Sequence, residues 1–378
     1  MKKALAFILC AVMASAFAGC GSGSTETSST AATEAQTTEA QATEAQATVE
    51  PLSEDTKKQL DSALSEANFN GVAQITRGGS VIYQYAEGND DNGNPLTIDA
   101  SMPVGSVSKQ FCAAAVMLLC ENNRLSVDDK LDKYYPDYKY GDKITIKNLL
   151  NMSSGIPSYY MAIIRGDMLS ANEEENVKTI KDAIFGEELD FDPGNGYDYS
   201  NSNYFLLADI VEQVSKTSYH DYIRKSFLEP LQMKNTGFVE EISGGYEWTS
   251  ALSKTEVMDE TACPGFVKGA GDIVTNAEDM DKWMHGLSGG TVISPDSLRQ
   301  MTETINPDSA EDYGYGLFHM PYDGVGHTGQ IPPHFGAVDY FNTTDDVYLF
   351  AAANTPPGMS FVEQLPEALL SILLGDEE

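Results

Sequence analysis

The alternation of apolar and polar residues predicts β-strands near both ends of the chain. Residues 71–76 and 81–85 alternate and are joined by Gly78-Gly79, a combination typical of a β-hairpin. Towards the C-terminus, the pattern predicts strands at residues 314–318, 325–328, 336–341 and 347–353. We therefore expect one sheet that combines the first hairpin with the last strands.

Helical periodicity dominates between these strands and on either side of them. Apolar residues recur with helical spacing in residues 54–67, 104–121, 204–214, 279–287 and 363–374. The predicted fold class is α/β (α+β), an antiparallel sheet flanked by helices with an all-helical insertion. In a folded domain over residues 53–378, the expected sheet subdomain covers about 53–100 and 265–378, and the helical insertion about 106–260.

The first 52 residues have no pattern that could form a core. Lys2 and Lys3 precede an apolar run that ends in Ala18-Gly19-Cys20, which is typical of an export signal over residues 1–20. The ending resembles a bacterial lipoprotein box, which implies that Cys20 is lipidated and anchors the protein outside the cytoplasm on the cell membrane. Ordinary cleavage and secretion is the alternative. Residues 21–52, rich in Ser, Thr, Glu, Ala and Gln, are expected to form a disordered tether.

Charge and cysteine content narrow the range of partners. The chain has 23 basic and 57 acidic residues, a net charge of −34. Nucleic acid is therefore excluded as a partner, because phosphate binding needs a basic face. Cys112 and Cys120 are too far apart on one predicted helix to bridge each other, and neither a disulfide framework nor a metal-binding spacing is present.

The predicted helix at 104–121 carries the main candidate chemistry, Ser106 and Lys109. Residues three apart lie on one helix face, so the hydroxyl and the amine point the same way. A lysine at the start of a buried helix is partly desolvated, which favours the neutral amine that can take a proton from a hydroxyl. We predict that Ser106 is a nucleophile and Lys109 its base. The alternative is a serine that only caps the helix.

Two further motifs could reach the same cleft. Tyr199-Ser200-Asn201 precedes an amphipathic helix and is expected on a loop. A phenol next to a lysine can relay a proton, and an amide can hold the lysine and bind a substrate carbonyl. His327-Thr328-Gly329 is expected on a C-terminal edge strand, where glycine allows a substrate backbone to approach. Each motif is weak alone, since a single histidine on a strand is more often structural, but their order and setting favour one site.

Together the motifs resemble the serine beta-lactamase and penicillin-binding-protein superfamily, most closely its class C beta-lactamase, DD-carboxypeptidase and esterase branch. Ser-Val-Ser-Lys at 106–109, Tyr-Ser-Asn at 199–201 and His-Thr-Gly at 327–329 match the three motifs of that branch in order. Further matches extend the resemblance over about residues 53–378: NNRLSVDDKLDKYYPDY (122–138), LLNMSSGI (149–156), YSNSNYFLLADIVE (199–212) and FLEPLQMKNTGF (227–238).

The resemblance implies an acyl-enzyme mechanism without a metal or cofactor. Ser106 would attack a carbonyl with Lys109 as base, and Tyr199 would shuttle the proton and assist water in deacylation. The backbone N–H groups of Ser106 and Gln330 would form the oxyanion hole. The residues implied to bind substrate are Asn201, His327, Thr328, Gly329 and Gln330.

The implied function is a serine hydrolase that acts on D-amino-acid peptides of the cell wall or on small esters and amides. Many class C beta-lactamases carry lysine at the position of His327, so histidine there argues against a dedicated beta-lactamase. We expect activity toward carboxylate-bearing substrates to change between about pH 5 and 8 as the imidazole titrates. The alternatives are a beta-lactamase proper and a non-catalytic lipoprotein that binds penicillin or wall peptides.

Overall fold

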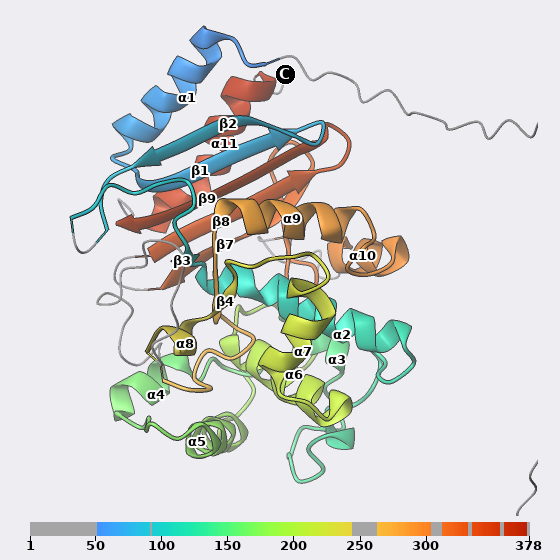
Figure 1. The fold of residues 1–378 in the computed structure, drawn as a ribbon. Helices are drawn as coiled ribbons and strands as arrows, with labels where there is room; N and C mark the ends of the chain where they lie inside the picture. The colour runs from blue at the N-terminus through green and yellow to red at the C-terminus, as the bar shows by residue number, and fades with distance from the viewer. Residues whose placement is uncertain are drawn as a thin grey trace, which may run out of the picture. The chain divides into compact units, whose positions relative to one another are not determined.

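One antiparallel sheet joins the two ends of the folded domain. The computed structural model describes residues 51–90, 93–243, 263–303, 312–331, 335–355 and 359–375. Within these residues, six strands pair in the order β2-β1-β9-β8-β7-β6 (Figure 1). They are β1 (Asn70–Arg77), β2 (Ser80–Glu87), β6 (Phe318–Met320), β7 (Gly324–Ile331), β8 (Phe335–Asn342) and β9 (Val347–Thr355). Because β1 pairs with both β2 and β9, the predicted union of the first hairpin with the last strands is confirmed.

Helices cover both faces of this sheet, so two apolar layers form. α1 (Glu54–Glu66) and α11 (Met359–Leu374) pack on one face (Figure 1). α9 (Ala277–Ser288) packs on the other face, against β1, β8 and β9. Side chains alternate along β8, so Val338 enters the layer with α1 and its neighbour Ala337 enters the layer with α9.

The helical part follows β3 in the chain and is closed by a second, smaller sheet. Its helices are α2 (Lys109–Glu121), α3 (Ile146–Leu150), α4 (Tyr160–Gly166), α5 (Glu173–Gly186), α6 (Asn201–Ser215), α7 (Tyr219–Ile223) and α8 (Val239–Ser243), and α10 (Pro295–Thr302) follows α9. Short turns of helix are η1 (Gly105–Ser108), η2 (Leu131–Lys133) and η3 (Arg224–Leu228). The small sheet has the order β3-β5-β4, with β3 (Met102–Pro103), β4 (Gly237–Phe238) and β5 (Ile273–Thr275). The predicted fold class is confirmed, and the small sheet is an addition to it.

The start of α2 is locked between the sheet and α9. Every residue from Lys109 to Met117 is buried. Phe111 stacks on Trp283 of α9 with ring centroids 3.7 Å apart. The Gln110 side chain accepts a hydrogen bond from Trp283 Nε1 (2.6 Å) and donates one to Asp339 Oδ1 of β8 (2.9 Å). A polar side chain thus ties α2 to both neighbours within a close-packed core, which fixes the position of its first turn.

One predicted strand is misplaced. The strand expected at residues 314–318 is wrong, because β6 begins only at Phe318. Gly316 turns the chain there with a φ of +72°, and a Cβ at this position would lie 2.8 Å from the Lys109 carbonyl oxygen. The segment before β6 is therefore a turn packed on α2 and not a ladder partner of β7.

The N-terminal predictions fall outside the described residues. The export signal at 1–20 with its lipidation site Cys20, and residues 21–50 of the predicted tether, are not described. None of the helices that are described combines the length and hydrophobicity needed to cross a lipid bilayer. The predicted limits of the subdomains stay a prediction.

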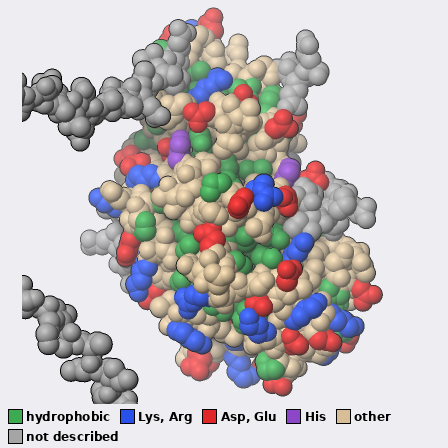
Figure 2. Space-filling model, turned by 90° about the vertical axis from the view of Figure 1, so that its right-hand side faces the viewer, with side chains coloured by type: hydrophobic (Ala, Val, Ile, Leu, Met, Phe, Trp, Pro, Cys, Tyr) green, Lys and Arg blue, Asp and Glu red, His purple; other side chains and the backbone are tan. Residues whose placement is uncertain are grey.

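Charges of both signs are mixed over the visible surface. On the face shown in Figure 2, Asp and Glu side chains lie among Lys and Arg side chains, with hydrophobic side chains between them. On this face the acidic balance of the sequence therefore appears as a mixed, solvated surface and not as one acidic patch.

We predict that Gly71→Ala destabilises the sheet. A Cβ on Gly71 of β1 would lie 2.1 Å from the Ala352 carbonyl oxygen of β9, so the two strands must separate. Forcing a methyl into such a contact costs about 1–3 kcal/mol, and thermal unfolding followed by circular dichroism should show a lower Tm. Gly186→Ala is the matched control, since a Cβ there meets nothing within 4 Å. Equal Tm changes in the two variants would contradict the prediction.

Candidate active site

The turn before α2 holds Ser106 at a partly exposed position. Gly105, the residue before it, has a φ of +53°, and a Cβ there would lie 2.6 Å from the backbone nitrogen of Gln330, so glycine is required. Ser108 fixes the same turn: its Oγ donates to the Gly105 carbonyl (2.6 Å) and accepts from the Ile273 N–H of β5 (2.9 Å). Ser106 is thus the partly exposed residue of a buried, tightly held turn.

Lys109 lies directly behind this serine and has no exposed surface. Its Nζ donates to Ser106 Oγ (3.1 Å), Asn201 Oδ1 (2.8 Å) and the Ala270 carbonyl oxygen (2.6 Å). Burial lowers the pKa of Lys109 to about 7, because water no longer solvates the ammonium group. Ammonium and neutral amine therefore coexist near neutral pH, and the neutral form can accept the Ser106 proton.

The beginning of α6 brings the second motif to this lysine. Asn201 is the first residue of α6, and its amide oxygen holds the amine. Tyr199 lies just before the helix, with its ring centroid 4.9 Å from Lys109 Nζ, and the ring of Tyr204 lies 5.7 Å from the same atom. Aromatic faces attract a cation, so these rings line the amine without adding a formal charge.

His327 lies on β7 beside this group, but its ring is turned into the protein. The residue is 1% exposed. Its Nδ1 bonds to the Thr328 carbonyl oxygen (2.5 Å) and its Nε2 to the Tyr313 hydroxyl (3.2 Å). Since a carbonyl oxygen only accepts, we assign the proton to Nδ1, and Tyr313 then donates to Nε2. Both ring nitrogens are therefore engaged within the protein.

The charge state of His327 differs from the sequence-based expectation. Burial, together with the nearby charge of Lys109, lowers the pKa of His327 to about 3. The imidazole therefore stays neutral between about pH 5 and 8, and the expectation that it titrates there is wrong. Lys109 is the motif residue whose pKa falls in that range.

β7 meets the turn with Ser106 through glycine backbone. A Cβ on Gly329 would lie 1.9 Å from the Val104 carbonyl oxygen and 2.8 Å from the Ser106 backbone nitrogen. Gly105 approaches the Gln330 backbone nitrogen in the same way. The two amides predicted as an oxyanion hole thus come from segments in direct contact. Thr328 and Gln330 are partly exposed on the same strand.

The structure therefore brings the predicted residues of all three motifs to one region, and it adds others. The carbonyl oxygen of Ala270 binds Lys109, and every residue type has such an oxygen, so no sequence signal could have found it. Tyr313 bonds the His327 ring. Asp339 Oδ1 accepts from the His327 N–H (3.1 Å), and burial raises the pKa of Asp339 to about 7. A carboxyl group in the apolar strand 335–341 was a signal that sequence reasoning missed.

The comparisons with known proteins agree with this geometry. The Beta-lactamase family matches residues 45–374, and the chain belongs to this family. The resemblance predicted from the three motifs is thus confirmed, and the fold is that of a family of serine hydrolases. Among the described residues, no group of three or more His, Cys, Asp or Glu side chains is placed to hold a metal ion.

The chain is similar in sequence to penicillin-binding proteins, and it shares its fold with an amidase of known structure. The chain is 29% identical over 314 residues to Putative penicillin-binding protein PbpX of Bacillus subtilis (strain 168), covering 79% of this chain and 74% of that one. It is 29% identical over 293 residues to Penicillin-binding protein 4* of the same organism, covering 70% of this chain and 63% of the relative. D-amino acid amidase from Ochrobactrum anthropi SV3 complexed with D-phenylalanine has a TM-score of 0.71 at 22% identity over 85% of this chain and 100% of its own, which concerns the fold alone.

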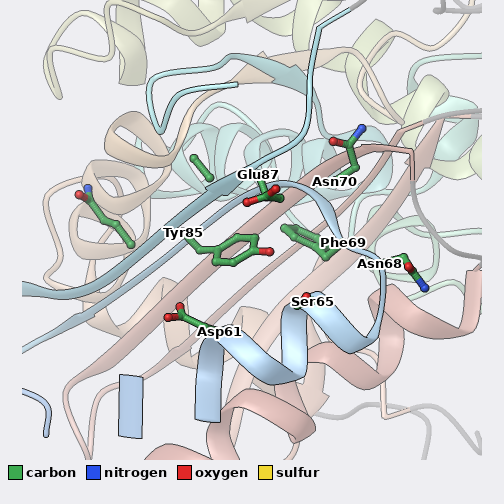
Figure 3. A pocket seen from close by; sticks show the side chains of 9 residues that line it. Asp61, Ser65, Asn68, Phe69, Asn70, Tyr85 and Glu87 are labelled. Carbon is green, nitrogen blue, oxygen red and sulfur yellow. The ribbon is translucent and has the colours of Figure 1, made fainter. Parts of the chain in front are cut away.

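A separate hollow lies on the α1 side of the sheet. It has a volume of about 730 Å³ between the end of α1 and the first two strands, and Figure 3 shows Asp61, Phe69, Tyr85 and Glu87 around it. No residue of the three motifs lines it. The hollow is therefore distinct from the candidate active site.

We predict that one lysine of the folded protein titrates near neutral pH. Because burial lowers the pKa of Lys109 to about 7, its amine loses the proton as the pH rises through that value. NMR of protein labelled at the lysine Cε should show one resonance with such a midpoint, and this resonance should be missing in Lys109→Met. If every lysine titrates near its usual value of about 10.4, the predicted charge state is wrong.

Proposed function

We propose that the protein is a serine hydrolase that forms a covalent acyl-enzyme at Ser106 and acts on D-amino-acid peptides or on small amides and esters. The observation that supports this best is the 3.1 Å contact between the fully buried amine of Lys109 and the Ser106 hydroxyl. An amine whose burial brings its pKa to about 7 can act as a base at neutral pH, where an ordinary lysine is protonated.

Acylation would follow from this contact. Neutral Lys109 takes the hydroxyl proton of Ser106 while Oγ forms a bond to the substrate carbonyl carbon, and the carbonyl π electrons move to its oxygen. The backbone N–H groups of Ser106 and Gln330 donate to that oxyanion, and such a donor contributes about 3 kcal/mol in the transition state. The C–N or C–O bond then breaks, and the leaving group takes the proton from Lys109, relayed by Tyr199.

Deacylation would use the same groups in reverse. A water molecule gives a proton to Lys109 through Tyr199 and attacks the acyl carbon, and the Ser106–acyl bond breaks as Oγ takes the proton back. Asn201 and Ala270 keep the amine in place through both steps, since both bond to Nζ. The free acid leaves, and the enzyme returns to its starting state.

The surroundings of His327 favour substrates without a free carboxylate next to the scissile bond. The imidazole is neutral, and aromatic rings flank it: Phe318 at 4.7 Å and Tyr199 at 6.1 Å between centroids. A fixed cation at this position would attract a carboxylate, and a neutral ring does not. The shared fold of a D-amino acid amidase supports amides as one substrate class. Beta-lactamase activity and non-catalytic wall-peptide binding are the competing functions, and intact motifs disfavour the latter.

We predict that a fluorophosphonate probe adds once to the wild-type protein and not to Ser106→Ala, as measured by intact mass. In a parallel hydrolysis panel, acetyl-D-alanyl-D-alaninamide should have a kcat/KM at least about tenfold above that of the matching free acid. The panel also contains a short-chain nitrophenyl ester and a chromogenic cephalosporin.

Each other outcome of this panel selects a competing function. Faster cleavage of the free acid would contradict the substrate preference alone. Rapid cephalosporin turnover would favour a beta-lactamase. A wild-type protein without any adduct would favour a binding protein, and equal labelling of Ser106→Ala would show that the nucleophile is assigned wrongly.

We also propose that the enzyme acts outside the cytoplasm, anchored to the membrane by a lipid on Cys20. The support is the sequence alone: an export signal that ends in Ala-Gly-Cys, and a polar tether that follows it. A flexible chain of that length spans about 30 Å on average. We predict that Cys20→Ala moves the protein from the membrane fraction to the soluble fraction, as seen by immunoblot. A variant that stays with the membrane would argue against the lipid anchor.

A further inference from the structure

A second, largely enclosed polar cluster is centred on His220 of α7, with Asp272 buried and His220 and Glu240 partly exposed. The ring Nδ1 lies 2.7 Å from Glu240 Oε1, and Nε2 lies 3.0 Å from Asp272 Oδ2. The ring stacks on Phe238 with centroids 3.8 Å apart. Burial by itself would lower the pKa of His220, but the hydrogen bonds to Asp272 and Glu240 outweigh it and raise the pKa to about 9. His220 is therefore a cation at neutral pH, with one carboxylate on each ring nitrogen.

The two carboxylates fasten the segment that leads into β5. Asp272 Oδ2 also accepts from the Gly269 N–H (3.0 Å), and the Asp272 carbonyl oxygen accepts from the Val239 N–H (2.8 Å). Glu240 Oε2 accepts from the Gly265 N–H (3.1 Å). The His220 cation thus links the two carboxylates that hold this segment, Glu240 near its beginning and Asp272 at its end.

The fastened segment is the one that binds Lys109. Ala270 lies between Gly269 and Asp272, and its carbonyl oxygen is 2.6 Å from Lys109 Nζ. The segment has little room to move, since a Cβ on Gly269 would lie 2.9 Å from the Tyr204 carbonyl oxygen of α6. Any shift of the segment therefore displaces an acceptor of the amine.

The cluster also acts on Lys109 through charge. Burial is the main influence on the pKa of Lys109, and the nearby Asp272 carboxylate opposes it by favouring the ammonium form. The titratable side chains around Lys109 are Cys112, Tyr199, Tyr204, Asp272 and His327. Those around His220 are Tyr219, Glu240 and Asp272, with Arg224 over the Phe238 ring and Lys268 near Glu240. Asp272 is the member common to both groups.

We infer that His220 is a positioning residue of the active site. Its cation, held between Glu240 and Asp272, anchors the Ala270 carbonyl and offsets the Asp272 charge that would otherwise favour the ammonium form of Lys109. This inference rests on the proposed function, in which the neutral amine of Lys109 is the base. Without the cation, the ammonium group of Lys109 is harder to deprotonate, and the Ala270 carbonyl that accepts from it is less firmly held.

The test measures the rate of fluorophosphonate labelling at Ser106 between about pH 5 and 9 by intact mass, so it needs no knowledge of the natural substrate. In His220→Gln, the midpoint of the rising acidic limb should move up by about one pH unit, and labelling near pH 6 should fall about tenfold. In Asp272→Asn, where the amide oxygen can still accept from the Gly269 N–H, the midpoint should move down. Shifts of opposite sign are not expected from a purely structural role.

His285→Gln is the matched control. His285 also stacks on an aromatic ring, that of Tyr348 at 3.7 Å, and lies 3.5 Å from the carboxylate of Asp281, but its partners are on α9 and β9. The acidic midpoint of the labelling rate of His285→Gln should equal that of the wild type. Suppose that the wild type is labelled, and that the acidic midpoint of the labelling rate is unchanged in His220→Gln and Asp272→Asn, with or without a loss of rate. The inference is then overturned, while the proposed function stands. If the wild type is not labelled at any pH, the proposed function fails. Should His220→Gln not fold, His220→Asn takes its place in the same comparison, with the same upward shift expected.

Discussion

The burial of one amine against one hydroxyl is the constraint on which the rest of this structure depends. Lys109 has no exposed surface, and its Nζ contacts oxygens from η1, from the start of α6 and from the segment before β5. Removing an amine from water is unfavourable unless such acceptors replace the lost hydration. The fold must therefore bring three segments that are distant in sequence to within hydrogen-bonding distance of a single atom. The packing of α2, α6 and the small sheet serves this requirement.

Two different kinds of wall enclose the site. Where β7 meets the turn that holds Ser106, Gly105 and Gly329 allow backbone to touch backbone, and a Cβ at either of them would clash. On the helical side, the wall consists of side chains, those of Tyr199, Tyr204 and Asn201 among them. A wall of backbone presents N–H groups whose direction is fixed before a ligand arrives, which is the arrangement that stabilises a developing negative charge. In the side-chain wall, the phenol of Tyr199 is a group that can relay a proton, and the amide of Asn201 is one that holds the amine.

The sequence was enough to predict features that depend on the type and spacing of individual residues. It was not enough to predict features that depend on neighbours from distant parts of the chain. Ser106 and Lys109 have chemistry and spacing that point to each other, and the segments around them follow a clear helical or alternating pattern. His327 was identified, but its charge was not, because that depends on the aromatic side chains of residues 313 and 318 that the β6–β7 turn folds over it. The small sheet was missed, since strands of two or three residues carry no period. No sequence pattern pointed to His220, because its two carboxylate partners, Glu240 and Asp272, lie elsewhere in the sequence.

The pairing of β1 with β9 has a consequence for the order in which the protein assembles during its synthesis. Asn70 pairs with Thr355, and the turn that holds Ser106 touches Gly329, so the last strands complete both the sheet and the site. A ribosome that has passed Ala270 has already made the serine, the lysine and every acceptor of the lysine, but not the strand that faces them. Contacts of such long sequence separation form slowly and late. The candidate site therefore cannot be completed until synthesis is nearly finished, and a product that ends before β7 keeps Ser106 and Lys109 but lacks the Gln330 backbone that faces them.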